Sequence, residues 1–225
     1  MKIPMQLTCA GLSLLVLLSA VGGVVSVGYA GDGAEAQERT GQHAEPDEKA
    51  GQQIFVTCAR CHGSDGLGPR DGTAPAIAGQ YARVVISELV DFRPRYANRK
   101  DPRMERIANL HLLSQPQEIA EVAYFVSTMP RGPVPASGSG GGVNRGKTLY
   151  QAQCAGCHGA SAQGNERRTI PWLNSQHYEY LQREISYAQE QRRPNMEKAH
   201  ATLFRGFTPQ DVDGIADYLS RLPPT

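Results

Sequence analysis

Two short segments of the chain carry residues whose types and spacing predict chemistry. Each reads Cys-x-x-Cys-His, and they span residues 58–62 and 154–158. Two thiols at this spacing can form thioether bonds to the vinyl groups of a haem, and the histidine that follows becomes the proximal iron ligand. The sequence therefore predicts two covalently attached haem c groups. The residues predicted to attach and ligate them are Cys58, Cys61 and His62 for the first, and Cys154, Cys157 and His158 for the second.

The two motifs belong to an internal repeat with an offset of 96 residues. An apolar triplet at helical spacing recurs at this offset, because Val85, Leu89 and Phe92 match Leu181, Ile185 and Ala188. We match Met104 with Met196, where the offset is 92, and it is 93 for the final apolar segments that begin at Ile119 and Val212. The chain therefore contains two copies of one haem-binding unit. Other pairs at the offset of 96 are Gly63 and Gly159, Pro75 and Pro171, and Gln80 and Gln176.

The apolar residues follow helical spacing and show no strand alternation, which predicts an all-α fold. The final helix of each copy is predicted to open at Pro116 and at Pro209. We divide the chain into a signal segment (1–30), a polar lead-in (31–48), a first domain (49–129), a Pro/Gly-rich linker (130–143) and a second domain (144–225).

The N-terminal segment predicts export. Met1-Lys2 precedes a long apolar run, and small residues end it near Ala30, where a signal peptidase would cut. The run exceeds the roughly 7–15 apolar residues of most signals, so a retained membrane anchor is the alternative. We expect a periplasmic protein. A zinc site or a thioredoxin-like pair is disfavoured, because each Cys pair has its own adjacent histidine in an exported chain.

Charge argues against nucleic acid as a partner. The chain has 23 basic and 22 acidic side chains, without the basic excess that such binding needs. The sequence instead favours redox proteins as partners, with membrane association through the N-terminal segment left open.

Methionine and proline are predicted to complete each iron site. Met104 and Met196 lie in polar stretches and offer thioether sulfur as the sixth ligand, which favours ferrous iron. Core packing is the alternative, and it is the role predicted for the unmatched Met129. Pro75 and Pro171 each follow their histidine by 13 residues, so their carbonyls are predicted to accept the imidazole N–H.

The other polar candidates are weaker. His43, His111, His177 and His200 match no histidine in the other copy, so we predict surface or structural roles for them rather than iron ligation. Arginines precede both methionines and would either pair with haem propionates or remain solvated. They are Arg93, Arg95 and Arg99 in the first copy and Arg192 and Arg193 in the second.

With these residues in hand, the chain from about Ala50 onward resembles the class I c-type cytochromes and, more closely, the dihaem cytochrome c4 family of bacterial periplasms. The resemblance rests on the two haem motifs, residues 75–81, Phe92-Arg93 and the two methionines. It implies two tandem class I cytochrome c domains with neighbouring haems, ligated by His62 with Met104 and by His158 with Met196. One departure is Asn174-Ser175-Gln176, where the family has Ala-Gly-Gln.

The resemblance implies an electron carrier between a respiratory donor and an acceptor such as a terminal oxidase. It is not expected to be an enzyme, because six-coordinate iron has no open site for a substrate. A first alternative is the cytochrome subunit of a membrane-associated dehydrogenase or oxidase complex. A more distant one is a dihaem peroxidase or thiosulfate-oxidising cytochrome, which would need one iron with a vacant or labile sixth position.

Overall fold

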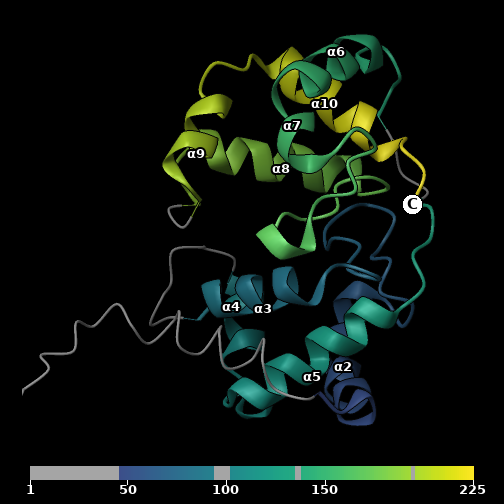
Figure 1. Ribbon diagram of the computed structural model, residues 1–225, viewed down its shortest axis with the longest axis vertical. Helices are drawn as coiled ribbons and strands as arrows, with labels where there is room; N and C mark the ends of the chain where they lie inside the picture. The colour runs from purple at the N-terminus through teal and green to yellow at the C-terminus, as the bar shows by residue number, and fades with distance from the viewer. Residues whose placement is uncertain (1–45, 94–101, 135–137, 194–195) are drawn as a thin grey trace, which may run out of the picture. The chain divides into compact units, whose positions relative to one another are not determined.

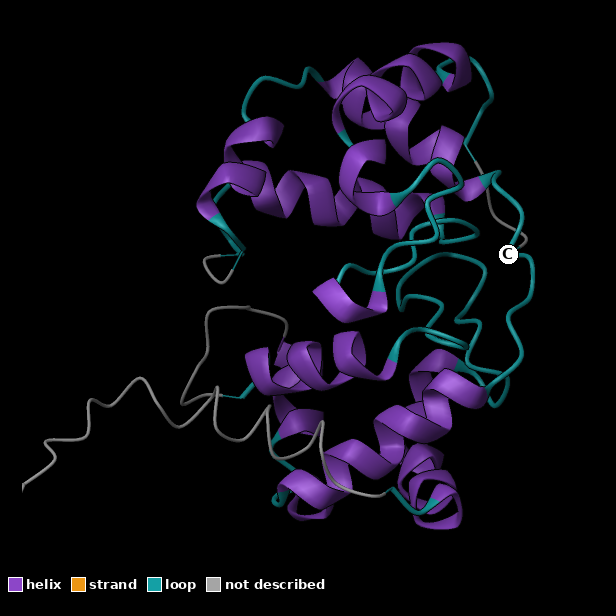
Figure 2. Ribbon diagram, in the orientation of Figure 1, coloured by secondary structure: helices purple, strands orange, loops and turns teal. Residues whose placement is uncertain are grey.

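The structure, a computed structural model, describes residues 46–93, 102–134, 138–193 and 196–225. The predicted signal segment and nearly all of the lead-in lie outside these ranges. Within them the chain forms α-helices and short 3-10 helices, and the one β pairing is an isolated bridge between Asn165 and Ile170 (Figure 2). The predicted all-α class is confirmed. None of the helices in these ranges has both the length and the apolar character to cross a membrane.

The first half is built around a crossing of its first and last helices. Its elements are α2 (Glu48–His62), α3 (Ala82–Asp91), α4 (Pro102–Ala108), the 3-10 helix η2 (His111–Leu113) and α5 (Pro116–Thr128) (Figure 1). The carboxylate of Asp47 caps α2 by accepting the N–H groups of Lys49 and Ala50. Helix α5 packs against α2 and α3. Phe55, Leu89 and Val122 meet there in a buried apolar core.

The second half repeats this order. Its elements are α6 (Val143–Gln153), α7 (Ala155–His158), the 3-10 helix η3 (Glu166–Arg168), α8 (Tyr178–Gln189), α9 (Lys198–Phe204) and α10 (Pro209–Ser220). Helix α10 packs against α6 and α8, as α5 packs in the first half. One difference is local: the helix that leads into the haem motif is interrupted at Cys154, whereas α2 runs unbroken to His62.

The described part of the linker lies against the second half. The guanidinium of Arg131 donates to the backbone carbonyl of Asn174 at 2.9 Å and stacks on the ring of Trp172. The N–H of Val134 donates to the Ser175 hydroxyl at 3.2 Å. Further on, the N–H of Gly140 donates to the Asp217 carboxylate at 2.6 Å. A segment rich in Pro and Gly is thus held by specific hydrogen bonds.

Candidate haem sites

Helix α2 presents the first motif on its last turn and ends at His62, which is buried. The Nδ1 atom of His62 lies 2.9 Å from the carbonyl oxygen of Pro75. A carbonyl can only accept, so Nδ1 carries the proton and Nε2 is the nitrogen that bears the lone pair. This is the tautomer that a proximal haem histidine needs, with its orientation set by the loop.

The second motif has the same arrangement with a longer contact. His158 ends α7, is buried, and places Nδ1 3.4 Å from the carbonyl oxygen of Pro171. The pKa of His158 is lowered to about 4, mainly because the imidazole is buried. The hydrogen bond to Pro171 acts in the opposite direction and raises this pKa. The imidazole is therefore neutral near pH 7, which is the form that ligates a metal.

The four thiols are alike in the two motifs. Cys58 and Cys154 are partly buried, while Cys61 and Cys157 are exposed. Burial raises the pKa of Cys58 and of Cys154 to about 11. Thiol–disulfide chemistry uses the thiolate, so a protonated buried thiol in each motif disfavours that use.

A cavity of about 250 Å³, mostly apolar, lies beside the first motif. It brings the predicted residues of the first site together, since its walls include Cys58, Cys61, His62, Pro75 and Met104. The second half contributes to the same walls. An apolar hollow next to two thiols and a buried imidazole whose Nε2 bears the lone pair fits a covalently attached haem. The residues contributed by the second half include Pro171, Trp172, Leu173, Tyr180, Leu181 and Tyr187.

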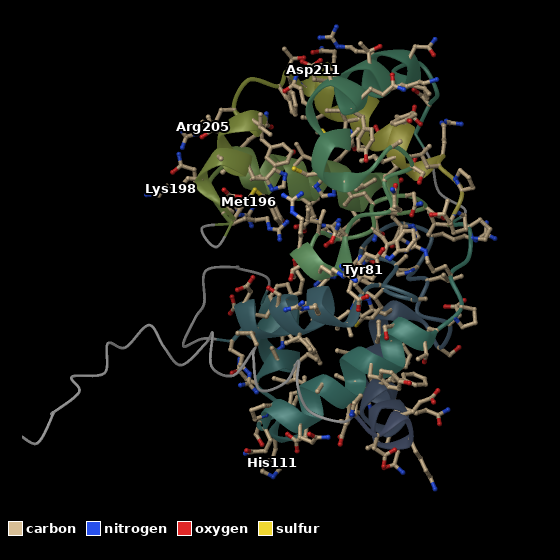
Figure 3. The ribbon with its side chains drawn as sticks, in the orientation of Figure 1. Tyr81, His111, Met196, Lys198, Arg205 and Asp211 are labelled. Carbon is tan, nitrogen blue, oxygen red and sulfur yellow. The ribbon has the colours of Figure 1, made fainter. Side chains whose placement is uncertain are left out.

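The two predicted methionine ligands are placed differently. Met104 lies within α4, lines the cavity and packs against the first core. Met196 is partly buried and lies just before the first residue of α9 (Figure 3). Among the described residues that pack against the second core, Met196 does not appear. Close to the second motif the structure places His200 of α9, whose ring centre is 6.0 Å from that of His158.

Of the other histidines, His111 is exposed and points into solvent (Figure 3). His177 is fully buried, with Nε2 2.7 Å from the carbonyl oxygen of Leu67, so it joins the two halves. His43 lies outside the described residues. Both Met129, buried in the first core, and His177 therefore occupy structural positions.

The described arginines near the sites have protein partners. Arg93 donates to the carbonyl of Leu113. Arg193 contacts the carboxylates of Glu88 at 3.1 Å and Glu184 at 3.2 Å, one from each half. Arg192 lies over the ring of Tyr187 at 3.8 Å. Arg95 and Arg99 lie outside the described residues. Arg192 and Arg193 also line the cavity beside the first motif.

A feature that the sequence analysis did not assign is a reciprocal pair of glutamines. The Gln176 side chain donates to the carbonyl of Ala76 and accepts its N–H, both at 2.9 Å. The Gln80 side chain does the same with Trp172, at 3.3 and 3.2 Å. Each glutamine thus binds the residue after the proline whose carbonyl faces the histidine of the other half. We call these four hydrogen bonds the glutamine clasp.

Comparison with known proteins now defines the class. The family model described as Cytochrome c matches residues 48–130 and again residues 143–223. The two halves are therefore two cytochrome c domains, each with its own covalently bound haem c.

The similarity to curated proteins and to solved structures covers both domains of this chain. Cytochrome c4 of Azotobacter vinelandii is 30% identical over 202 residues, which cover 80% of this chain and 91% of that protein. The thiosulfate dehydrogenase electron acceptor of Stutzerimonas stutzeri is 28% identical and covers 74% of this chain and 79% of its own length. The crystal structure of reduced cytochrome c4 from Pseudomonas stutzeri superposes with a TM-score of 0.70 at 22% identity, covering 79% of this chain and 99% of that one. The chain belongs to the cytochrome c4 family of dihaem electron-transfer cytochromes.

Proposed function

We propose that this protein is a periplasmic electron carrier that takes single electrons from a respiratory donor and passes them to an acceptor such as a terminal oxidase. The bound haem supplies reversible one-electron chemistry. The chain's own residues hold it, exclude water and close the iron to substrates. The first iron would be held by His62 and Met104, and the second by His158 with a residue of the segment around α9, for which the sequence predicts Met196.

The observation that carries this proposal is the pairing of each buried imidazole with a proline carbonyl, at 2.9 Å for His62 and 3.4 Å for His158. Such a pairing orients a ligand permanently, as electron transfer with little rearrangement requires. The apolar cavity around the first motif serves the same end, because a dry environment leaves few water molecules to reorganise when the charge changes.

A second candidate differs in the partner only. The chain would be the electron acceptor of a dehydrogenase, which is how one of its relatives is described. The same two haem sites would serve this role, with the dehydrogenase as donor.

The test uses the purified holoprotein. We expect two haems per chain, reduction of both by an added one-electron donor without turnover of a substrate, and rapid reoxidation by membranes that contain a terminal oxidase. Thiosulfate added alone should not reduce the protein, whereas thiosulfate with a thiosulfate dehydrogenase would do so if the second candidate holds. Reduction by thiosulfate alone, or peroxidase turnover, would contradict a pure carrier.

Cell fractionation and the mass of the mature protein test the location. A soluble periplasmic form that begins after Ala30 supports a free carrier. A membrane-bound form that retains residues 1–30 would instead favour the subunit of a membrane complex.

A further inference from the structure

The helix bounds change which residue of the second half corresponds to Met104. Helices α4 and α9 each have seven residues and each precedes the final helix of its half. Met104 is the third residue of α4, and His200 is the third residue of α9. These two positions are 96 residues apart, which is the offset of the haem motifs themselves.

This match also gives a simpler repeat. Seven residues separate α4 from α5, whereas four separate α9 from α10. One shortening by three residues, after the ligand helix, takes the offset from 96 to 93. The match of Met104 with Met196 needs a deletion of four residues and then an insertion of one. Pairing methionine with methionine therefore requires one more change in loop length than pairing Met104 with His200.

The ring geometry supports the same assignment. A metal–imidazole bond is about 2 Å long and the ring centre lies roughly 1 Å beyond the nitrogen, so two imidazoles on opposite sides of one metal ion have ring centres about 6 Å apart. The ring centres of His158 and His200 are 6.0 Å apart, and their planes are inclined by 41°. The ring of Phe204, one turn further along α9, packs 5.0 Å from His200 and limits its motion.

From this register and spacing we propose that His200, and not Met196, is the sixth ligand of the second iron. The protein would then hold one His/Met haem, through His62 and Met104, and one His/His haem, through His158 and His200. The proposal rests on the proposed function only in that a haem must be attached at the second motif.

Unequal ligation gives the two haems unequal potentials. Thioether sulfur stabilises ferrous iron and raises the potential, whereas a second imidazole does not. The second haem is therefore the lower in potential. With this order of potentials, transfer from the second haem to the first would be the downhill direction.

The test is spectroscopic and uses the ferric holoprotein. We expect the far-red sulfur-to-iron band at the intensity of one haem per chain, and a bis-imidazole low-spin EPR signal from the other. His200→Met should add a second sulfur-to-iron band and raise the potential of one haem alone. Met196→Leu should leave both spectra and both potentials unchanged, as should the control His111→Ala at an exposed position.

The opposite pattern would overturn the assignment. Two sulfur-to-iron bands in the unaltered protein, one of them lost in Met196→Leu, would make Met196 the ligand and His200 a bystander. The haem-to-chain ratio distinguishes a failure of the dihaem function from a failure of the His200 assignment. One haem per chain in the unaltered protein would refute the dihaem function itself, whereas two haems with two sulfur ligands would refute only His200.

Discussion

Tyr150 is a single side chain on which the second haem loop depends. It is fully buried, and its hydroxyl donates to the carbonyl of Gly159 at 2.6 Å, directly after His158. Burial raises the pKa of Tyr150, so the phenol remains a protonated donor. Tyr150→Phe should lower the free energy of unfolding by about 1 kcal/mol, because the carbonyl loses its phenol donor but keeps the N–H of Ala162. Chemical denaturation followed by haem absorbance measures this, and the exposed Tyr124→Phe serves as the control.

The residues of the sites differ in how far the sequence predicts them. In each motif the two thiols and the histidine lie within five consecutive residues, so their chemistry is visible locally. Matching by residue type paired Met104 with Met196, and the helix register that points to His200 depends on loop lengths that only the fold reveals. The glutamine clasp is also not predictable from the sequence. The repeat aligned the two glutamines, but each binds backbone of the other half, and no spacing within one copy encodes that contact.

At the scale of elements, the crossing of α6 and α10 depends on a missing side chain. A Cβ atom added to Gly146 would collide with the main-chain carbonyl of Gly214, which cannot rotate away. Gly146→Ala should therefore separate the two helices and lower the free energy of unfolding by about 1–3 kcal/mol. Thermal denaturation of the variant should show this loss. Gly206→Ala is the matched control, because the nearest atom to its added Cβ is 4.0 Å away; equal losses in both variants would refute the packing argument.

The start of α10 is a second element that can be tested. The sequence predicted its opening at Pro209, and the structure adds a capping box. The Thr208 hydroxyl accepts the N–H of Asp211 at 3.2 Å, and the Asp211 carboxylate accepts the N–H of Thr208 at 2.9 Å. Thr208→Ala should cost about 1 kcal/mol of unfolding free energy. Thr148→Ala, at an exposed site within α6, should cost nothing, since alanine favours helix.

The same cap makes stability depend on pH. The Thr208 hydroxyl and N–H, followed by Arg145, hold the pKa of Asp211 below its ordinary value. A folded-state pKa below the unfolded one contributes stability that is present above the unfolded value and lost as pH falls through the folded value. Asp211→Asn should therefore be less stable at pH 7 and should lose less stability than the unaltered protein below about pH 4. Parallel pH profiles of the two proteins in urea denaturation would exclude this role for Asp211.

At the scale of the whole molecule, the two domains are joined through the loops that face His62 and His158. His177 of the second half donates to Leu67 of the first, and Arg193 contacts one glutamate from each half. The glutamine clasp is the most direct of these links. The carbonyls of Pro75 and Pro171 face His62 and His158, and the residues that follow these prolines are the ones that the clasp binds. The domain contacts and the two predicted iron ligands, His62 and His158, are thus connected by hydrogen bonds.

This arrangement predicts a crossed effect of two mutations on the haem potentials. Gln176→Ala releases Ala76 and so loosens the carbonyl that accepts from His62, whereas Gln80→Ala releases Trp172 and loosens the partner of His158. A proximal imidazole whose N–H is held less firmly is a weaker donor to iron, and iron with a weaker donor is more easily reduced. Each variant should therefore raise the potential of the haem in the opposite domain, measured by spectroscopic redox titration. Gln182→Ala, whose hydrogen bonds stay within the second half, should shift neither potential. If each glutamine instead shifted the haem of its own domain, the clasp would be a packing contact without influence on the proximal histidines.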